Sequence, residues 1–287
     1  MKKTLSWMLA LVMLFCALVC IIPVYTLAAD EPPTSGQCGD DVWYVYDSNT
    51  DILTIYGTGP MWDFFYDGWH AYTPFERYRH IAIEDGVTSV GDYAFWDSDL
   101  ESISLPESLE SIGERAFYWC QLAKIVISKN VQFIGKNAFT YSEIQELHVE
   151  PQNNWFRSID GVLFTADMKT LLAYPVASQT KHYTVPKGVE IIAESAFCAI
   201  DHDTLETISF PDSLRIIEKY AFLSQRVLRD VRLPPKLEHV GDWSFFAVDS
   251  FACIEFPATM TEIEGEVFLL FEEVSEMFFL GPPPYFW

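Results

Sequence analysis

The segment LESISLPESLESIGERAFYWC, residues 100–120, is the clearest copy of a pattern that recurs along most of this chain. Its Ala116-Phe117 pair has counterparts throughout the sequence. Seven phenylalanines align with it, at spacings of 22, 22, 58, 25, 23 and 23 residues. They are Phe95, Phe117, Phe139, Phe197, Phe222, Phe245 and Phe268. Repeats of 20–30 residues are typical of solenoids, in which each unit is one coil.

Four offsets before each phenylalanine carry the same kind of residue. At 14, 12, 8 and 5 residues before it, all 28 positions are apolar. In the copy quoted above these positions are Ile103, Leu105, Leu109 and Ile112. Proline stands eleven residues before the phenylalanine in five units, and glycine stands four before it in four units, at Gly91, Gly113, Gly135 and Gly241.

These offsets predict the shape of one coil. The positions at 14 and 12 alternate, so they point to one face of a short strand. The proline ends that strand, because it donates no hydrogen bond to a neighbour. The remaining apolar positions continue the inward face, and we expect the glycine to permit a positive φ at a turn. One coil cannot bury its apolar face alone, so the coils must stack.

The full pattern resembles the repeat of the BspA-like leucine-rich repeat proteins of bacteria. The resemblance extends from about residue 81 to residue 281 and implies a β-rich solenoid with short parallel strands and short helical turns. Residues 158–175 resemble the hairpin-containing variant repeat of that family, which accounts for the 58-residue gap. Residues 35–61 resemble the cap that often precedes such arrays. Ser128, Ala193, Glu218 and Glu264 depart from the proline or glycine pattern.

We therefore predict three segments. Residues 1–29 combine Lys2 and Lys3, an apolar run and a small-residue exit, which is typical of a secretory signal peptide. An uncleaved membrane anchor is the alternative, since the run is nearly long enough to span a bilayer. Residues 30–78 form an aromatic-rich N-terminal cap. Residues 79–287 form the solenoid, with the variant unit at about 150–185, and no membrane span remains after cleavage.

Composition narrows the classes of partner. The chain has 18 basic and 41 acidic residues, a net charge of −23. Binding to nucleic acid through phosphates needs clustered Lys and Arg, so we expect no nucleic-acid partner. The 50% hydrophobic content is that of a folded chain rather than a disordered one.

Cysteine spacing gives no sign of a metal or redox centre. Cys38, Cys120, Cys198 and Cys253 lie far apart, without a Cys-x-x-Cys pair. Export permits disulfides, but Cys120 and Cys198 lie just after an Ala-Phe, where we expect buried free thiols.

No catalytic motif is present, so we predict a protein that is not an enzyme and uses no cofactor or metal. A hydrolase with an acidic site remains a third and weaker hypothesis. A calcium site at Asp97 and Asp99, or at Asp201 and Asp203, is a further alternative to solvated turns.

Aromatic residues gather between residues 43 and 78. Large rings with a polar edge are favoured at recognition surfaces, although the end of a solenoid also needs covering. We select five of them as a possible binding surface: Trp62, Phe64, Tyr66, Trp69 and Tyr72.

Members of the BspA-like family are associated with adhesion. The resemblance therefore implies a secreted or cell-surface protein that recognises an extracellular protein or glycan. The alternative is a structural spacer or accessory module of a larger surface assembly. Fold alone does not choose between these functions.

Overall fold

The computed structural model describes residues 34–68, 71–199, 204–229, 231–248, 253–260, 262–263, 267, 276–281 and 285–286. All of them belong to the second of two units of the chain, residues 34–287. The predicted signal peptide, Trp69 and Phe268 lie outside the described residues, as do Asp201 and Asp203.

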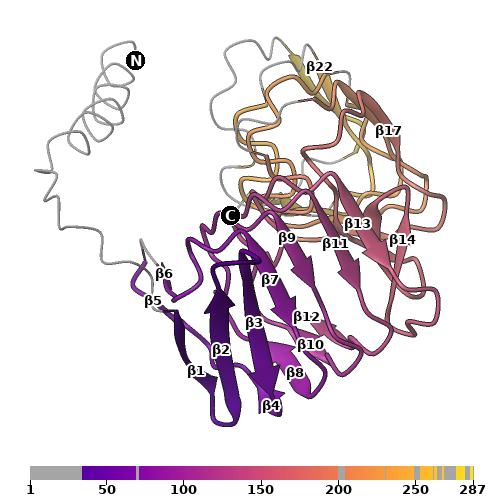
Figure 1. Cartoon of the computed structure of the whole chain (residues 1–287). Helices are drawn as coiled ribbons and strands as arrows, with labels where there is room; N and C mark the ends of the chain where they lie inside the picture. The colour runs from indigo at the N-terminus through magenta and orange to yellow at the C-terminus, as the bar shows by residue number, and fades with distance from the viewer. Residues whose placement is uncertain are drawn as a thin grey trace, which may run out of the picture. The chain divides into compact units, whose positions relative to one another are not determined.

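The N-terminal part is an antiparallel sheet that leads directly into the repeats (Figure 1). Strand β3 pairs in parallel with β7, so Leu53 and Ile55 lie beside Ile81 and Ile83 of the first repeat. The strands of this part are β1 (Ser35–Gly39), β2 (Val42–Asp47), β3 (Ile52–Gly57), β4 (Gly59–Pro60), β5 (Phe65–Tyr66) and β6 (Ala71–Tyr72).

Most regular coils contribute two short strands, each of which pairs in parallel with the equivalent strand of a neighbouring coil. The first strand lies where the sequence predicts it, and its pairing keeps the repeat in register, with Lys124 opposite Glu146 and Ile127 opposite Val149. These strands are β7 (His80–Ile83), β9 (Ser102–Ser104), β11 (Lys124–Ile127), β13 (Glu146–Val149), β17 (His182–Thr184), β19 (Thr207–Ser209), β22 (Cys253–Phe256) and β24 (Glu276–Phe279).

A second strand, of two residues in all coils but the first, lies at the apolar position five residues before the repeat phenylalanine. Ser111 and Ile112, for example, pair with Ser89 and Val90 on one side and with Phe133 and Ile134 on the other. These strands are β8 (Val87–Val90), β10 (Ser111–Ile112), β12 (Phe133–Ile134), β18 (Ile191–Ile192), β20 (Ile216–Ile217), β21 (His239–Val240), β23 (Glu262–Ile263) and β25 (Tyr285–Phe286).

The variant unit inserts a hairpin into the array. Strands β14 (Phe156–Ile159), β15 (Val162–Thr165) and β16 (Thr170–Ala173) are antiparallel, and β16 then pairs in parallel with β18. The side chain of Leu163 belongs to one apolar core, whereas Val162 and Phe164 belong to a second. Because alternate side chains of a strand point to opposite faces, β15 separates two stacks of coils.

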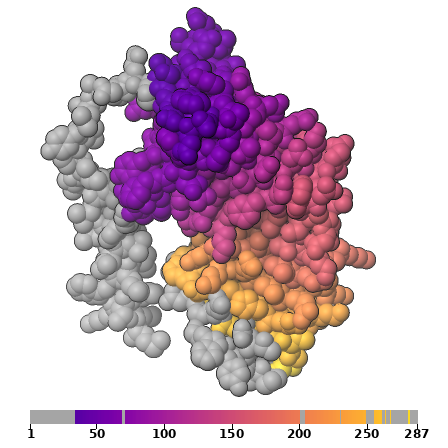
Figure 2. All heavy atoms as spheres, turned by 90° about the horizontal axis from the view of Figure 1, so that it is seen from below, coloured from indigo at the N-terminus to yellow at the C-terminus, as the bar shows by residue number. Residues whose placement is uncertain are grey.

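Stacked aromatic rings form the centre of both cores. Phe95, Phe117, Phe197, Phe222 and Phe245 are completely buried. Successive rings lie 4.8–5.8 Å apart within each stack. Each such pair adds about 0.5–1.5 kcal/mol beyond the area that it buries. Sequence neighbours are also neighbours across the surface in Figure 2, as a solenoid requires.

Two sequence-based expectations are wrong. The resemblance implied short helical turns, but the part of the chain that the structure describes contains turns and no helix. None of the described segments therefore has the helical length and apolar character that a membrane crossing requires.

The repeat glycines do not adopt positive φ. Left-handed φ occurs instead two residues before the phenylalanine, as at Tyr93 and Arg115, with values of 57° and 49°. Gly113 is glycine because a Cβ there would lie 2.5 Å from the backbone nitrogen of Asp92 in the preceding coil. Close approach between coils, rather than turn conformation, therefore excludes a side chain at this offset.

Candidate functional site

The most exposed aromatic pair of the N-terminal part lies on the β5–β6 hairpin, here called the aromatic hairpin (residues 65–72). Phe65 and Tyr72 face each other across the two strands, and their rings stack at 5.8 Å. Their exposed fractions are 68% and 57%. Exposed aromatic rings are the side chains that most often dominate the binding energy of recognition surfaces.

Tyr66 anchors the hairpin to the first repeat. Its ring is half-buried and stacks on Tyr93 at 5.0 Å, with a tilted contact to Trp96 at 4.8 Å. The Tyr66 hydroxyl donates to the carbonyl of Gly68 at 2.8 Å. The Thr73 hydroxyl donates to the Ala94 carbonyl at 2.6 Å. The exposed pair is therefore held on a fixed support.

Trp62 and Phe64 lie in the segment that leads into the hairpin. Trp62 is exposed, and its indole Nε1 donates to Asp40 Oδ1 at 3.0 Å. Phe64 is half-buried and contacts Phe75 edge-on at 5.6 Å, so it packs against the core. Of the five selected residues, Trp62 and Tyr72 are thus exposed, Phe64 and Tyr66 are supporting residues, and Trp69 lies outside the described residues.

The remaining aromatic side chains between residues 43 and 78 divide into a buried and an exposed group. Tyr44, Phe75 and Tyr78 are buried and cover the first coil. Trp43 and Tyr56 are opposite each other on β2 and β3 and are exposed on the outer face of the sheet. Buried and exposed rings therefore coexist in this cluster, and on β2 they alternate, with Tyr44 buried and Trp43 exposed.

A second aromatic group continues from the hairpin along the turns of the first coils. We call it the turn-side aromatic band: Tyr93, Trp96, Tyr118, Trp119 and Tyr141. Trp96 stacks on Tyr118 at 4.2 Å, and Tyr118 contacts Trp119 at 6.0 Å and Tyr141 at 5.1 Å. Trp119 is 47% exposed.

Arg115 contacts two rings of this band, Tyr93 and Tyr118. Its guanidinium lies 5.9 Å from the centre of the Tyr93 ring and 6.0 Å from that of Tyr118. Its Nη1 donates to the Tyr93 hydroxyl at 3.0 Å and to Glu114 at 2.8 Å. Cation–π contacts of this kind contribute about 0.5–1 kcal/mol at exposed sites. The rings of the band are therefore fixed by contacts with one another and with the Arg115 guanidinium, which adds one positive charge to this surface.

Two carboxylates, those of Asp67 and Asp40, accept hydrogen bonds from aromatic side chains at and before the hairpin. The Tyr72 hydroxyl donates to Asp67 Oδ2 at 2.9 Å, and this hydrogen bond raises the pKa of Tyr72 above its ordinary value. Asp40 accepts from Trp62 in the same way. Rings with hydrogen-bonded polar edges and nearby carboxylates suit a ligand that offers hydroxyl, amide or cationic groups.

No catalytic arrangement emerges around these rings. Within the described segments, no three His, Cys, Asp or Glu side chains lie close enough together to hold a metal ion. Asp99 accepts a hydrogen bond from Gln121 at 3.1 Å. Cys38, Cys120 and Cys198 are buried free thiols, which confirms the prediction for the last two. Burial raises the pKa of Cys120 and Cys198 to about 12, so neither is a nucleophile at neutral pH.

Sequence reasoning did not select Phe65 or Arg115. Arg115 was recoverable in part, because it stands among the aromatic positions of its coil. The hairpin register that pairs Phe65 with Tyr72 is not written in a period-2 pattern, since each strand has only two residues. The turn-side aromatic band is also difficult to predict from the sequence, because its residues belong to several different coils.

Comparison with known proteins places the whole array. The sequence model of the BspA type leucine rich repeat region matches residues 70–171 and 173–279, in six copies. No curated protein sequence matches the chain significantly.

Several solved structures share the fold. A leucine-rich repeat protein from Eubacterium ventriosum is 17% identical, with a TM-score of 0.60 over 85% of this chain and 84% of that one. A leucine rich cell surface protein from Faecalibacterium prausnitzii is 18% identical, with a TM-score of 0.60 over 87% and 96%. The pneumococcal vaccine antigen PcpA is 19% identical, with a TM-score of 0.54 over 80% and 82%.

Proposed function

Because the chain belongs to the BspA-type leucine-rich repeat family, we propose that it is an exported or cell-surface recognition module. In this proposal it binds an extracellular protein or glycan and catalyses no reaction. The leader-like residues 1–29 support export. The structural relative described as a cell surface protein supports the same location by analogy of fold.

One observation carries the binding part of the proposal: Phe65 and Tyr72 are stacked, exposed and held by Tyr66 against the first repeat. Aromatic anchors on a rigid support lose little conformational freedom on binding, which favours affinity. Trp62, in the segment before the hairpin, and Trp119, in the turn-side aromatic band, are further exposed aromatic side chains. A ligand that covers the hairpin and part of the band would therefore bury several rings.

The test compares two double variants of the full chain. Phe65→Ala with Tyr72→Ala removes the stacked pair. Phe133→Ala with Trp155→Ala removes an equal number of exposed rings, of 60% and 40% exposure, from a different part of the array. Each protein is assayed for binding to arrays of glycans and extracellular-matrix proteins.

We expect the wild type and the Phe133/Trp155 variant to bind the same ligand. We expect the Phe65/Tyr72 variant to bind it at least about tenfold more weakly, because hot-spot aromatics contribute about 2 kcal/mol or more. Equal binding by both variants contradicts the assignment of the hairpin. Absence of any binding above an acidic control protein contradicts recognition altogether and favours a spacer.

A further inference from the structure

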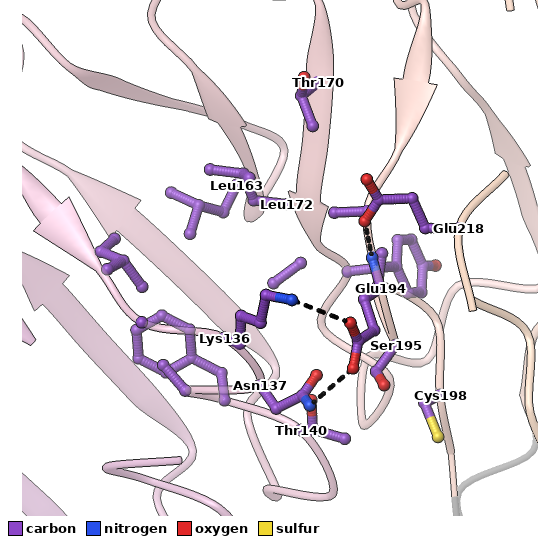
Figure 3. A pocket seen from close by; sticks show the side chains of 18 of the residues that line it. Lys136, Asn137, Thr140, Leu163, Thr170, Leu172, Glu194, Ser195, Cys198 and Glu218 are labelled. Carbon is purple, nitrogen blue, oxygen red and sulfur yellow. Dashed lines mark hydrogen bonds and ion pairs between the residues drawn. The ribbon is translucent and has the colours of Figure 1, made fainter. Parts of the chain in front are cut away.

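The array is interrupted at the variant unit, and a cavity occupies the interruption (Figure 3). Strand β12 is the last strand of one sheet, and β16 belongs to the next. A cavity of about 260 Å³ opens between the coil of Phe139 and the coils of Tyr174 and Phe197. Its apolar lining includes Leu163 and Leu172 from the variant unit.

Main-chain donors face this interruption without acceptors. In a regular coil, the N–H groups at and around the repeat phenylalanine bond to the next coil, as Phe117 does to the Ala138 carbonyl at 2.8 Å. The corresponding N–H groups of Asn137, Phe139 and Tyr141 have no hydrogen-bond partner within the described part of the chain. Asn137 and Phe139 line the cavity.

The ring ladder also stops on either side of the cavity. Phe139 stacks on Phe117 at 5.8 Å, and Tyr174 stacks on Phe197 at 4.7 Å. Tyr174 takes the phenylalanine place of its coil, since its N–H donates to the Ala196 carbonyl as the repeat phenylalanines do. Both Phe139 and Tyr174 line the cavity. Phe139 is the last ring of one stack and Tyr174 the first ring of the other, and these two rings do not stack on each other.

Polar side chains form the rim. Glu194 reaches across the gap to Asn137 Nδ2 at 3.4 Å and to Lys136 Nζ at 3.6 Å (Figure 3). The Glu194 N–H donates to Glu218 Oε2 at 2.9 Å. Asn137 Oδ1 is buried and accepts no hydrogen bond from any described residue. A buried polar atom without a partner costs about 1–3 kcal/mol, so a ligand that pairs it gains affinity.

We propose that this cavity binds a neutral phenol ring. The ring takes the place of a rung between Phe139 and Tyr174. Its hydroxyl accepts from the free main-chain N–H groups and donates to Asn137 Oδ1, since one hydroxyl can do both. The cavity volume lies just below the roughly 300–1,000 Å³ of drug-sized ligand pockets, so it suits one ring rather than a longer chain.

The charges around the cavity favour an uncharged ligand. Two carboxylates, Glu194 and Glu218, line the cavity against one ammonium group, and the whole chain carries −23. A ring that bears a carboxylate is therefore repelled, whereas a phenol is uncharged at neutral pH. The same chemistry occurs in free small phenols and in the tyrosine side chain of a partner protein. The proposal is independent of the function assigned to the aromatic hairpin.

The test titrates the full chain with 4-methylphenol and, separately, with toluene, and follows each ligand by NMR. We expect 4-methylphenol to bind with a Kd at or below about 1 mM, and toluene at least tenfold more weakly. Intermolecular NOEs should connect the bound ring to the methyl groups of Leu163 and Leu172. A Kd above about 1 mM for 4-methylphenol, a toluene affinity within tenfold of it, or NOEs from another region overturns the proposal.

Two variants give an independent check. Ala173→Leu extends a side chain from β16 into the cavity and should abolish binding of 4-methylphenol. Ala82→Leu makes the same change on the outward side of β7 and should leave binding unchanged. Unchanged binding to Ala173→Leu contradicts the site. If that variant does not fold, the wild-type NOEs decide the question.

A short peptide, acetyl-Gly-Tyr-Gly-amide, separates the two sources of the ring. If it binds and competes with 4-methylphenol, the cavity accepts a partner's tyrosine. If only 4-methylphenol binds, the cavity takes a free phenol. Either result supports the site, whereas peptide binding without competition contradicts a shared site.

Discussion

Replacing Gly113 by alanine tests why the repeat needs glycine. A Cβ at this position would lie 2.5 Å from both the backbone N and the Oδ1 of Asp92, and 2.6 Å from the carbonyl carbon of Gly91. Ordinary contacts between heavy atoms are about 3.5–4.0 Å, so the two coils must separate locally by about 1 Å. The neighbours are largely backbone, which cannot move aside as a flexible side chain can.

The magnitude follows from two opposing effects. Overpacking of this kind costs about 1–3 kcal/mol. It also strains the hydrogen bonds from Gly113 N to the Val90 carbonyl and from Glu114 N to Asp92 Oδ1. Loss of a glycine stiffens the unfolded chain and contributes about 0.4–1 kcal/mol in the opposite direction. We therefore expect a net loss of about 1–2 kcal/mol in the free energy of unfolding.

Urea denaturation measures this change, with the m-value as a check that the transition is otherwise the same. Ala193 occupies the same offset in the coil that follows the variant unit, where alanine is already accommodated. Ala193→Gly should cost only the entropy of a glycine, about 0.5–1 kcal/mol. If Gly113→Ala is as stable as the wild type or more so, contact between coils is not the reason for the glycine.

Three further predictions concern the core and the ion pairs. Phe222→Ala should lower the free energy of unfolding by about 3–5 kcal/mol in urea denaturation, because its ring is fully buried between two others; a loss below about 1 kcal/mol argues against the ladder. Cys120 and Cys198 should resist thiol reagents until the protein unfolds, as mapped by mass spectrometry of labelled peptides; labelling of the native protein contradicts their burial. Glu206, whose pKa is lowered to about 2 by hydrogen bonds from a lysine and an arginine, should stabilise the fold above pH 4.5. That contribution should vanish as pH falls from 4.5 to about 2, so the stabilities of wild type and Glu206→Gln should converge there in denaturation curves; a constant difference refutes it.

Sequence periodicity predicted the stack of coils because the same residues bury the same face in every repeat. The periodicity did not identify Tyr174 as a ladder residue. The variant unit changes the spacing at this point and places a tyrosine where other coils have phenylalanine. The glycine was correctly singled out for the wrong reason: sequence shows that a side chain is absent, but not which neighbour excludes it.

The candidate site was less predictable. Strand alternation explains why Tyr44 is buried while Trp43 is exposed, and that rule is available from sequence. The pairing of Phe65 with Tyr72 and the cavity beside Phe139 depend on contacts between distant segments. The sequence did contain one sign of the cavity: Ala193 and Glu218 stand where other repeats have glycine, and both residues line the cavity.

The most direct test of a stacked array with one interruption is amide hydrogen exchange at equivalent positions. The N–H groups of Phe117 and Phe222 bond to the next coil, whereas that of Phe139 faces the cavity. We predict strong protection of the first two amides and exchange at least about tenfold faster at Phe139, since it opens without global unfolding. Equal protection at all three positions contradicts the interruption and, with it, the proposed phenol site.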